Sequence, residues 1–157
     1  MNVRPLDEAE REWVRRTLEE LWSDGIVVSR GTVHEPSTLR GFVAEADGQP
    51  VGLLTYRIEA GECEVVTIDA FPEGAGAGTA MLEAVAAVAR EEGCRRVWLI
   101  TTNDNLRALR FYQRRGFHLV AVHPNALARS RELKPSIPEI GLDGIPLRDE
   151  LELELSL

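Results

Sequence analysis

The chain has 157 residues, of which 44% are hydrophobic and 28% charged, and it carries a formal net charge of −8. This composition is typical of one domain with a sizeable core. It argues against a nucleic-acid-binding protein, which needs a basic excess to neutralise phosphates. No apolar run approaches the length that spans a membrane, so we expect a cytoplasmic protein without membrane contact.

The cysteines and histidines give no sign of a metal site. They show no zinc-like spacing, and Cys63 and Cys94 lie in apolar, strand-like contexts. We therefore expect both cysteines to be buried, reduced thiols, and we expect no metal cofactor.

The first part of the chain predicts a short strand over 1–5, then a helix and a loop. The helix begins at Asp7, an N-cap with Glu10 three residues later, and Gly25 is expected to end it. Residues 26–40 contain a short β-like run followed by turn residues, and their weak periodicity is compatible with a loop on the substrate side.

Three antiparallel strands are expected next. Residues 41–46 and 50–58 flank Asp47-Gly48, a strong hairpin signal, and a second turn leads into a strand that begins at Glu62. Between that strand and an amphipathic helix lie three alternating glycines, Gly74, Gly76 and Gly78. Glycines let a backbone approach a ligand closely, and the free N–H groups at a helix start attract anions. This glycine turn therefore predicts a phosphate site.

Two nucleotide-binding interpretations of the glycine turn fail on its residues. A P-loop needs Lys and then Ser or Thr after its last glycine, whereas Thr79-Ala80 follows here. A dinucleotide fold needs G-x-G-x-x-G and an acidic residue at the end of the next strand. Here the spacing is G-x-G-x-G and the next strand ends in Thr101-Thr102-Asn103. A glycine-rich turn that binds nothing stays open as the simpler alternative.

The remaining elements complete an α+β pattern over one domain, residues 1–157. A strand over 95–102 leads to a helix that Asp104 or Asn103 can cap and Gly116 ends. After it we expect a strand, a short helix and a proline- and glycine-rich covering loop, over 117–122, 125–133 and 134–146. Residues 148–155 alternate leucine with acid, which predicts a final half-exposed strand that finishes the sheet or pairs across a homodimer.

Residues 62–117 resemble the GNAT acetyltransferase superfamily. The family's phosphate motif, Gln/Arg-x-x-Gly-x-Gly/Ala, is matched by Glu73-x-x-Gly76-x-Gly78. Its downstream motif is matched by Asn105, Ala108, Phe111-Tyr112 and Gly116-Phe117. The resemblance implies a mixed, mostly antiparallel sheet of about six to seven strands, flanked by helices and splayed at its centre. It also implies transfer of an acetyl group from acetyl-coenzyme A to an amine.

One residue departs from the family pattern. Glu73 stands where the family usually has Gln or Arg, which puts an acid beside a pyrophosphate. We expect its side chain to turn away from the ligand, so that backbone N–H groups carry the contact. Arg107, Arg110 and Arg114 could meet the 3′-phosphate of the coenzyme, although a solvated basic helix face is more typical.

The resemblance also implies site residues. Backbone groups of two strand residues would pair with the pantetheine arm, the turn would hold the pyrophosphate, and an asparagine would position the arm or the tyrosine. These cofactor-binding residues are Val66, Ile68, Gly74, Ala75, Gly76, Ala77, Gly78, Thr79 and Asn105. A backbone N–H near Val66 could also polarise the thioester carbonyl.

Acid–base catalysis would need two further groups. Glu62 and Glu64, two residues apart on one strand face, are the candidate bases for the amine proton, and Asp69 is a weaker third. Either glutamate could equally be a solvent-facing strand residue. Tyr112 is the candidate acid for the departing thiolate, because the pKa of a phenol, near 10, suits that role.

The leading hypothesis is an N-acetyltransferase that transfers the acetyl group directly in a ternary complex. The acceptor would be a small-molecule amine or a protein amine, and the acidic composition weakly favours a cationic one. Two alternatives stay open. The chain could be a coenzyme-A-binding sensor without turnover, or it could use another acyl-coenzyme A.

Overall fold

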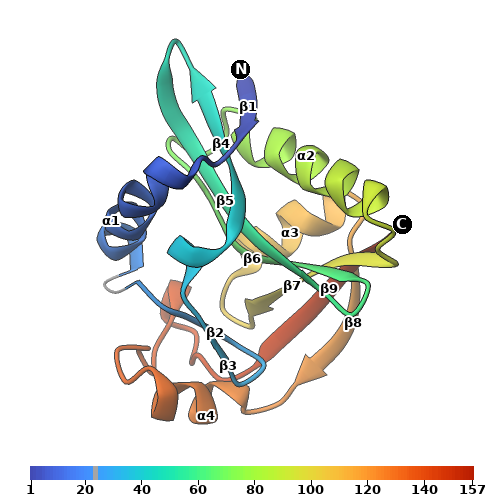
Figure 1. Cartoon of the computed structure of the whole chain (residues 1–157). Helices are drawn as coiled ribbons and strands as arrows, with labels where there is room; N and C mark the ends of the chain where they lie inside the picture. The colour runs from blue at the N-terminus through green and yellow to red at the C-terminus, as the bar shows by residue number, and fades with distance from the viewer. Residues whose placement is uncertain (23–24) are drawn as a thin grey trace.

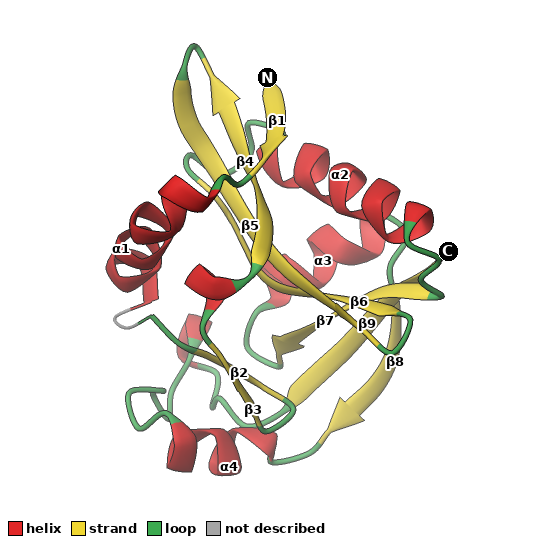
Figure 2. Cartoon of the chain, viewed as in Figure 1, coloured by secondary structure: helices red, strands yellow, loops and turns green. Residues whose placement is uncertain are grey.

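The computed structural model describes residues 1–22 and 25–157, which form a mixed seven-stranded sheet, a separate two-stranded hairpin and four α-helices (Figures 1 and 2). In spatial order the large sheet contains β1 (Asn2–Pro5), β4 (Arg40–Ala46), β5 (Gln49–Glu59), β6 (Glu62–Ala70), β7 (Arg96–Thr102), β9 (Glu150–Ser156) and β8 (His118–His123). The hairpin is β2 (Val27–Ser29) with β3 (Thr32–His34), and the helices are α1 (Arg11–Trp22), α2 (Ala77–Glu91), α3 (Leu106–Arg114) and α4 (Ala126–Leu133). Only β6 and β7 pair in parallel, so the predicted mixed, mostly antiparallel sheet is confirmed.

The two faces of the sheet are covered by different elements (Figure 1). α2 and α3 pack on one face and bury the main apolar core, in which Met81, Val85 and Ala89 of α2 are fully buried. Their spacing of four residues places them on one helix face, as the sequence pattern predicts. On the other face, Val14 and Leu18 of α1 pack against Leu53. α4 and the β2–β3 hairpin lie at the lower end in Figure 1.

The N-terminal helix starts where the sequence predicts. Asp7 accepts the Ala9 N–H at 2.8 Å, and Glu10 accepts the Asp7 N–H at 2.9 Å, which completes a capping box. The first turn of this helix is a 3₁₀ turn. α1 is described as far as Trp22, and the predicted end of the helix near Gly25 borders on residues outside the described part of the chain. The β-like run predicted near the start of 26–40 is β2, but the segment is more regular than the predicted loop, since β2 pairs with β3 and a 3₁₀ turn follows at Pro36–Thr38.

β6 and β7 part after three residue pairs. The last parallel pair is Glu64 with Trp98; beyond it β6 continues along β5 and β7 continues along β9. In the β5–β6 register Tyr56 faces Val65 and Thr55 faces Thr67, so Val66 is an extra, bulged residue. The predicted splay of the central strands is therefore present, and a bulge lies at its origin.

The bulge has a consequence for side-chain direction. In a regular strand, residues five apart point to opposite faces. The extra residue in the bulge brings Glu64 and Asp69 back to the same face. Their partners on β5 support this, because Arg57 lies opposite Glu64, Leu53 lies opposite Asp69, and residues four apart on a regular strand share a face. Glu64 and Asp69 therefore both point to the face that carries α1 and the hairpin.

The C-terminal strand differs from its prediction. β9 lies between β7 and β8 and pairs with both, so it neither ends the sheet nor offers a free edge for a dimer. It is not half-exposed either, since the side chains of Glu150 and Glu152 are only 2% and 6% exposed. The edge strand at this end of the sheet is β8, with Leu119, Val120 and Val122 exposed. The leucine–acid alternation misleads because arginine and histidine side chains cover the acidic face in place of water.

The start of α3 is also capped differently from the prediction. Asn105 is the N-cap and accepts the Ala108 N–H at 3.1 Å. Asn103 and Asp104 instead hold the segment 134–149: Asn103 accepts the N–H groups of residues 148 and 149 at 3.0 Å, and Asp104 accepts that of Leu142 at 2.8 Å. The predicted covering loop is thereby fixed to the end of β7.

Residues 1–22 and 25–157 contain neither a membrane-spanning helix nor a metal-binding cluster. No helix there is long and apolar enough to cross a membrane. No group of three or more His, Cys, Asp or Glu side chains within 1–22 and 25–157 is arranged to hold a metal ion. Cys63 and Cys94 are buried free thiols, as expected.

Candidate active site

The glycine turn joins the end of β6 to the start of α2. Gly74 and Gly76 have φ of 85° and 90°, a left-handed conformation that other residues rarely adopt, and Gly76 is the N-cap of α2. No side chain caps this helix start, and a Cβ added at Gly74 or Gly76 would meet no atom within 4 Å. The first N–H groups of α2 are thus left for another partner, which fits an anion such as a phosphate.

Gly78 is a glycine for a different reason. Its φ is ordinary, but an added Cβ would lie 2.9 Å from the ring of Phe111 on α3. The absence of a side chain lets α3 lie close against the first turn of α2. The three alternating glycines therefore have two structural roles: Gly74 and Gly76 shape the turn, and Gly78 permits helix packing.

The splay provides an extended slot next to the glycine turn. Val66 and Ile68 lie on the half of β6 that has left β7, and both are half-buried. Within the described chain, the bulged Val66 has no residue opposite it on either neighbouring strand. An extended ligand arm that carries amide groups could pair here as a strand would, with its phosphates reaching the glycine turn.

Tyr112 lies on α3, with its ring 5.7 Å from that of Phe117 and edge-on to that of Phe111 at 5.3 Å. The side chain is 8% exposed, and its hydroxyl makes no hydrogen bond to any residue that the structure describes. Burial and the nearby negative charge of Asp69 raise the pKa of the phenol above its usual value. Tyr112 therefore stays protonated at neutral pH and has a proton to donate.

Glu64 is the centre of a buried polar network. Ser29 of β2 donates to Glu64 Oε2 at 2.7 Å, and Arg57 of β5 is 3.3 Å from Oε1. His34 of β3 lies 2.9 Å from the Ser29 hydroxyl and 3.8 Å from the carboxylate. Burial raises the pKa of Glu64, although Ser29 and Arg57 partly oppose the shift.

Glu62 has a different environment from Glu64. It forms ion pairs with Arg96 at 2.5 Å and Arg95 at 3.1 Å. The hydrogen bond from Arg96 lowers the pKa of Glu62, which makes this carboxylate a weaker base. Of the two predicted bases, the geometry favours Glu64.

Asp69 lies on the same face as Glu64, nearer the glycine turn. Burial raises its pKa to about 6, while a weak hydrogen bond from the Trp22 indole at 3.4 Å opposes the shift and the charge of Glu73 adds to it. A carboxylate with a pKa close to neutral can exchange protons readily at physiological pH. The sequence ranks Asp69 third because only the bulge brings it to the face of Glu64.

Sequence reasoning misses three polar partners of Glu64: Ser29, His34 and Arg57. The hairpin that carries Ser29 and His34 has no motif, and a lone histidine in a segment of weak periodicity gives no signal. Arg57 stands opposite Glu64 in the strand register, so the predicted β5–β6 hairpin could have indicated that contact.

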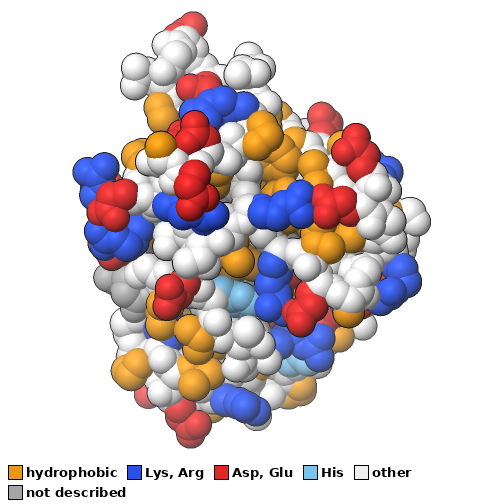
Figure 3. Space-filling model, viewed as in Figure 1, with side chains coloured by type: hydrophobic (Ala, Val, Ile, Leu, Met, Phe, Trp, Pro, Cys, Tyr) orange, Lys and Arg blue, Asp and Glu red, His pale blue; other side chains and the backbone are white. Residues whose placement is uncertain are grey.

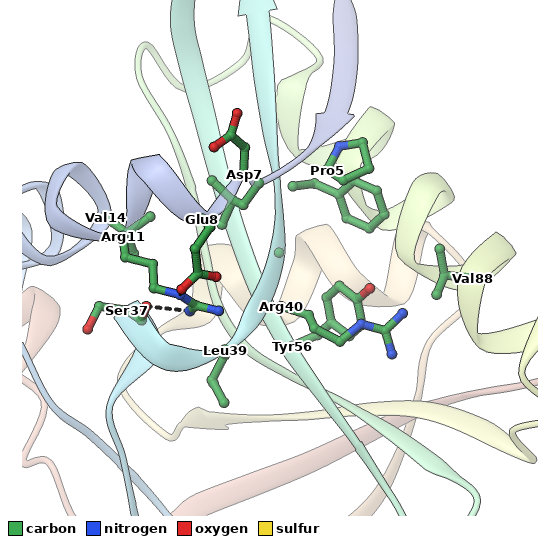
Figure 4. A pocket seen from close by; sticks show the side chains of 13 residues that line it. Pro5, Asp7, Glu8, Arg11, Val14, Ser37, Leu39, Arg40, Tyr56 and Val88 are labelled. Carbon is green, nitrogen blue, oxygen red and sulfur yellow. Dashed lines mark hydrogen bonds and ion pairs between the residues drawn. The ribbon is translucent and has the colours of Figure 1, made fainter.

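The surface of the described chain is hollowed near Glu64 and, separately, beside α1. One cavity of about 210 Å³ adjoins Glu64 and is lined by Arg30, Arg57, Glu59, Ala60, Glu62, Glu64, Arg96 and Trp98. The other, about 230 Å³, lies between the start of α1, β4 and α2, where Arg40 covers the ring of Tyr56 (Figure 4). It reaches Val88, roughly 17 Å along α2 from the glycine turn, and contains none of the predicted site residues.

Charges on the molecular surface are mixed. Figure 3 shows acidic and basic side chains next to one another over the visible face, without a large region of one sign. Paired charges such as Arg40 with Glu92 and Arg11 with Glu8 account for part of this pattern. On this face, recognition of a charged ligand therefore depends on local contacts.

Comparison with known proteins agrees with this geometry. A profile of the Acetyltransferase (GNAT) family matches residues 6–117. The protein YdhI of Bacillus subtilis (strain 168) is 37% identical over 152 residues, which cover 96% of this chain and 95% of YdhI. Among solved structures, the IAA acetyltransferase of Bacillus cereus ATCC 14579 has a TM-score of 0.76 at 20% identity over 99% of both chains. A Bacillus subtilis acetyltransferase in complex with CoA has a TM-score of 0.71 at 18% identity, over 99% of this chain and 98% of that one.

These matches define the class of protein. The family profile covers more than half of the chain, and the solved structures share its fold from end to end. This chain belongs to the GNAT acetyltransferase family. The resemblance that the glycine turn and the Asn105–Phe117 motif predict is confirmed.

Proposed function

We propose that residues 1–157 act as one N-acetyltransferase domain that moves an acetyl group from acetyl-coenzyme A directly to a primary amine in a ternary complex. The observation that carries this proposal is the parting of β6 and β7 beside the uncapped start of α2. In a member of the GNAT family, this slot and turn are the features that would hold the coenzyme.

The geometry supports the following binding roles. Val66 and Ile68 pair through their backbones with the pantetheine arm, and the N–H groups of the turn and first helical residues hold the pyrophosphate. Those residues are Gly74, Ala75, Gly76, Ala77, Gly78 and Thr79. Asn105 acts indirectly: its side chain is occupied in capping α3, so it positions the helix that carries Tyr112.

The chemical step needs one base and one acid. Glu64, directly or through a water chain, accepts the proton of the amine, whose nitrogen forms a bond to the acetyl carbon as the carbon–sulfur bond breaks. The N–H of the bulged Val66 stabilises the carbonyl oxygen, and Tyr112 donates its proton to the departing sulfur. Asp69 is the alternative base, while Glu62 holds Arg95 and Arg96 in place.

The acceptor binds on the face of the sheet that carries Glu64 and Asp69. Glu150 and Glu152 of β9 add two more buried carboxylates to this face. A cationic amine suits such surroundings better than an acidic acceptor. Both small-molecule amines and protein amines fit this chemistry. Two buried free thiols support a reducing, cytoplasmic setting.

The test is a screen of primary amines for release of free thiol from acetyl-coenzyme A. We expect release with at least one cationic amine, and we expect Tyr112→Phe to abolish most of it. If no amine gives release while coenzyme A still raises the unfolding temperature, the chain is a coenzyme-binding sensor rather than an enzyme. Repeating the screen with succinyl- and propionyl-coenzyme A would show whether another acyl donor is preferred.

A further inference from the structure

α3 presents one stripe of side chains to the glycine turn. Arg107 is 2.7 Å from Glu73, the ring of Phe111 packs on Gly78, and the segment after α3 brings Arg115 Nε 2.7 Å from Thr79 Oγ1. Arg107, Phe111 and Arg115 are spaced four residues apart, so they lie along one side of the helix. Two guanidinium groups thus border the turn that would hold phosphates.

Contacts within the stripe fix one arginine and leave the other free to move. Arg115 lies 3.7 Å over the Phe111 ring and also donates to the Phe111 carbonyl at 2.9 Å, so its position is defined from several sides. The Arg107 and Glu73 side chains are 77% and 64% exposed. An exposed ion pair of this kind contributes little stability, so a stronger anion can replace the carboxylate.

The charge at position 73 makes this stripe important. The family's usual Gln or Arg would offer a donor to the pyrophosphate, whereas Glu73 offers only negative charge. The nearest compensating cation is the guanidinium that Glu73 itself binds. Guanidinium groups bind phosphate oxygens through two parallel hydrogen bonds, more strongly than they bind an exposed carboxylate in water.

We propose that Arg107 is the pyrophosphate-binding cation of the coenzyme site and that Glu73 holds it beside the glycine turn until the coenzyme binds. Arg107 then exchanges the Glu73 carboxylate for the pyrophosphate. Arg115 positions the Thr79 hydroxyl: because its Nε occupies the oxygen as an acceptor, the hydroxyl hydrogen is directed to a phosphate oxygen. This inference rests on the proposed use of acetyl-coenzyme A.

The experiment is calorimetric titration of the full chain with three ligands: coenzyme A, 3′-dephospho-coenzyme A and pantetheine. Arg107→Gln should weaken binding of the first two by about tenfold and leave pantetheine unchanged, since only the first two carry the pyrophosphate. Arg90→Gln is the matched control: it removes the same charge from an exposed position in the last turn of α2, far from the glycine turn, and should change each affinity by less than about twofold. Glu73→Gln should tighten binding of both pyrophosphate ligands about threefold, because it removes a like charge.

Several results would overturn the inference. Equal effects of Arg107→Gln and Arg90→Gln would mean that net charge alone matters. A loss confined to coenzyme A would assign Arg107 to the 3′-phosphate, and an equal loss of pantetheine binding would make its role structural. Weaker binding by Glu73→Gln would show that the ion pair shapes the turn. If the unaltered protein does not bind coenzyme A at all, the proposed function is wrong as well. If it binds coenzyme A and gives one of the results above, only the inference about Arg107 is wrong.

Discussion

The two faces of β6, β7 and β9 both contain buried side chains but are chemically opposite. The face toward α2 and α3 is apolar, with Cys63, Val97 and Leu153 fully buried. The opposite face, toward the hairpin and α4, buries Glu64 and Glu152 at 3% and 6% exposure. Burial therefore does not distinguish the part of this sheet that holds the fold together from the part that carries reactive groups.

The polar face is buried at an energetic cost that the apolar face does not have. Burial raises the pKa of Glu64 and Glu150, which shows that their charged forms are destabilised. Glu152 is the exception: burial opposes ionisation, but hydrogen bonds from Arg96 and His123 lower its pKa overall. Because several carboxylates are buried on this face, their pKa values depend on their neighbours, and proton transfer can be tuned there. Five substitutions test this contrast.

The largest effect is expected from Tyr112→Phe. The ring keeps its packing against Phe111 and Phe117, but the proton for the leaving sulfur is lost, so kcat should fall by about 10³-fold. Coenzyme affinity and unfolding temperature should change little. Steady-state kinetics with titration of coenzyme A measures both, and an unchanged kcat would remove Tyr112 from the mechanism.

The apolar face should dominate stability. Leu153→Ala removes a fully buried side chain from the centre of β9 and should lower the free energy of unfolding by about 3 kcal/mol. Glu150→Gln, an equally buried change on the same strand, should cost less than about 1 kcal/mol at pH 8, because the amide oxygen can still accept the Arg30 N–H. Chemical denaturation gives both values. Equal losses would mean that the polar face also holds the fold together.

The polar face should dominate chemistry. Glu64→Gln should lower kcat by about 10²-fold without lowering the unfolding temperature, since a destabilised charge is removed while the Ser29 hydroxyl keeps an acceptor. In the unaltered enzyme, kcat should fall as the pH drops through the raised pKa of Glu64. Glu64→Gln should lose this acidic limb. If Asp69→Asn loses it instead, Asp69 is the base.

The smallest effect is a pH-dependent gain in stability for Asp69→Asn. The folded-state pKa of Asp69, about 6, lies above its ordinary value of 3.8, so the folded protein binds the proton more tightly than the unfolded chain. The ionised side chain therefore costs stability above pH 6, and this cost disappears as the pH falls toward 4. Asp69→Asn should raise the unfolding temperature by a few degrees at pH 8 and by nothing near pH 4. A pH-independent change would contradict the raised pKa.

Local signals in the sequence predicted much of this molecule. Turn residues, the Asp7–Glu10 capping box and the spacing of apolar residues located most strands and helices, because each depends on neighbours within a few residues. The glycine turn and the Asn105–Phe117 motif predicted the family. Glu73 pairs with Arg107, and its turning away from the ligand stays a prediction.

Tertiary structure alone decided the surroundings of the catalytic candidates. The bulge at Val66 depends on how β6 registers with β5, and it alone brings Asp69 to the face of Glu64. β9 enters between β7 and β8, so its acids are buried by arginines far away in sequence. The segment 26–40 folds into a hairpin whose Ser29 reaches Glu64. A sequence records which residues a strand contains, but strand order, register and long-range pairing are set by the free energy of the whole fold.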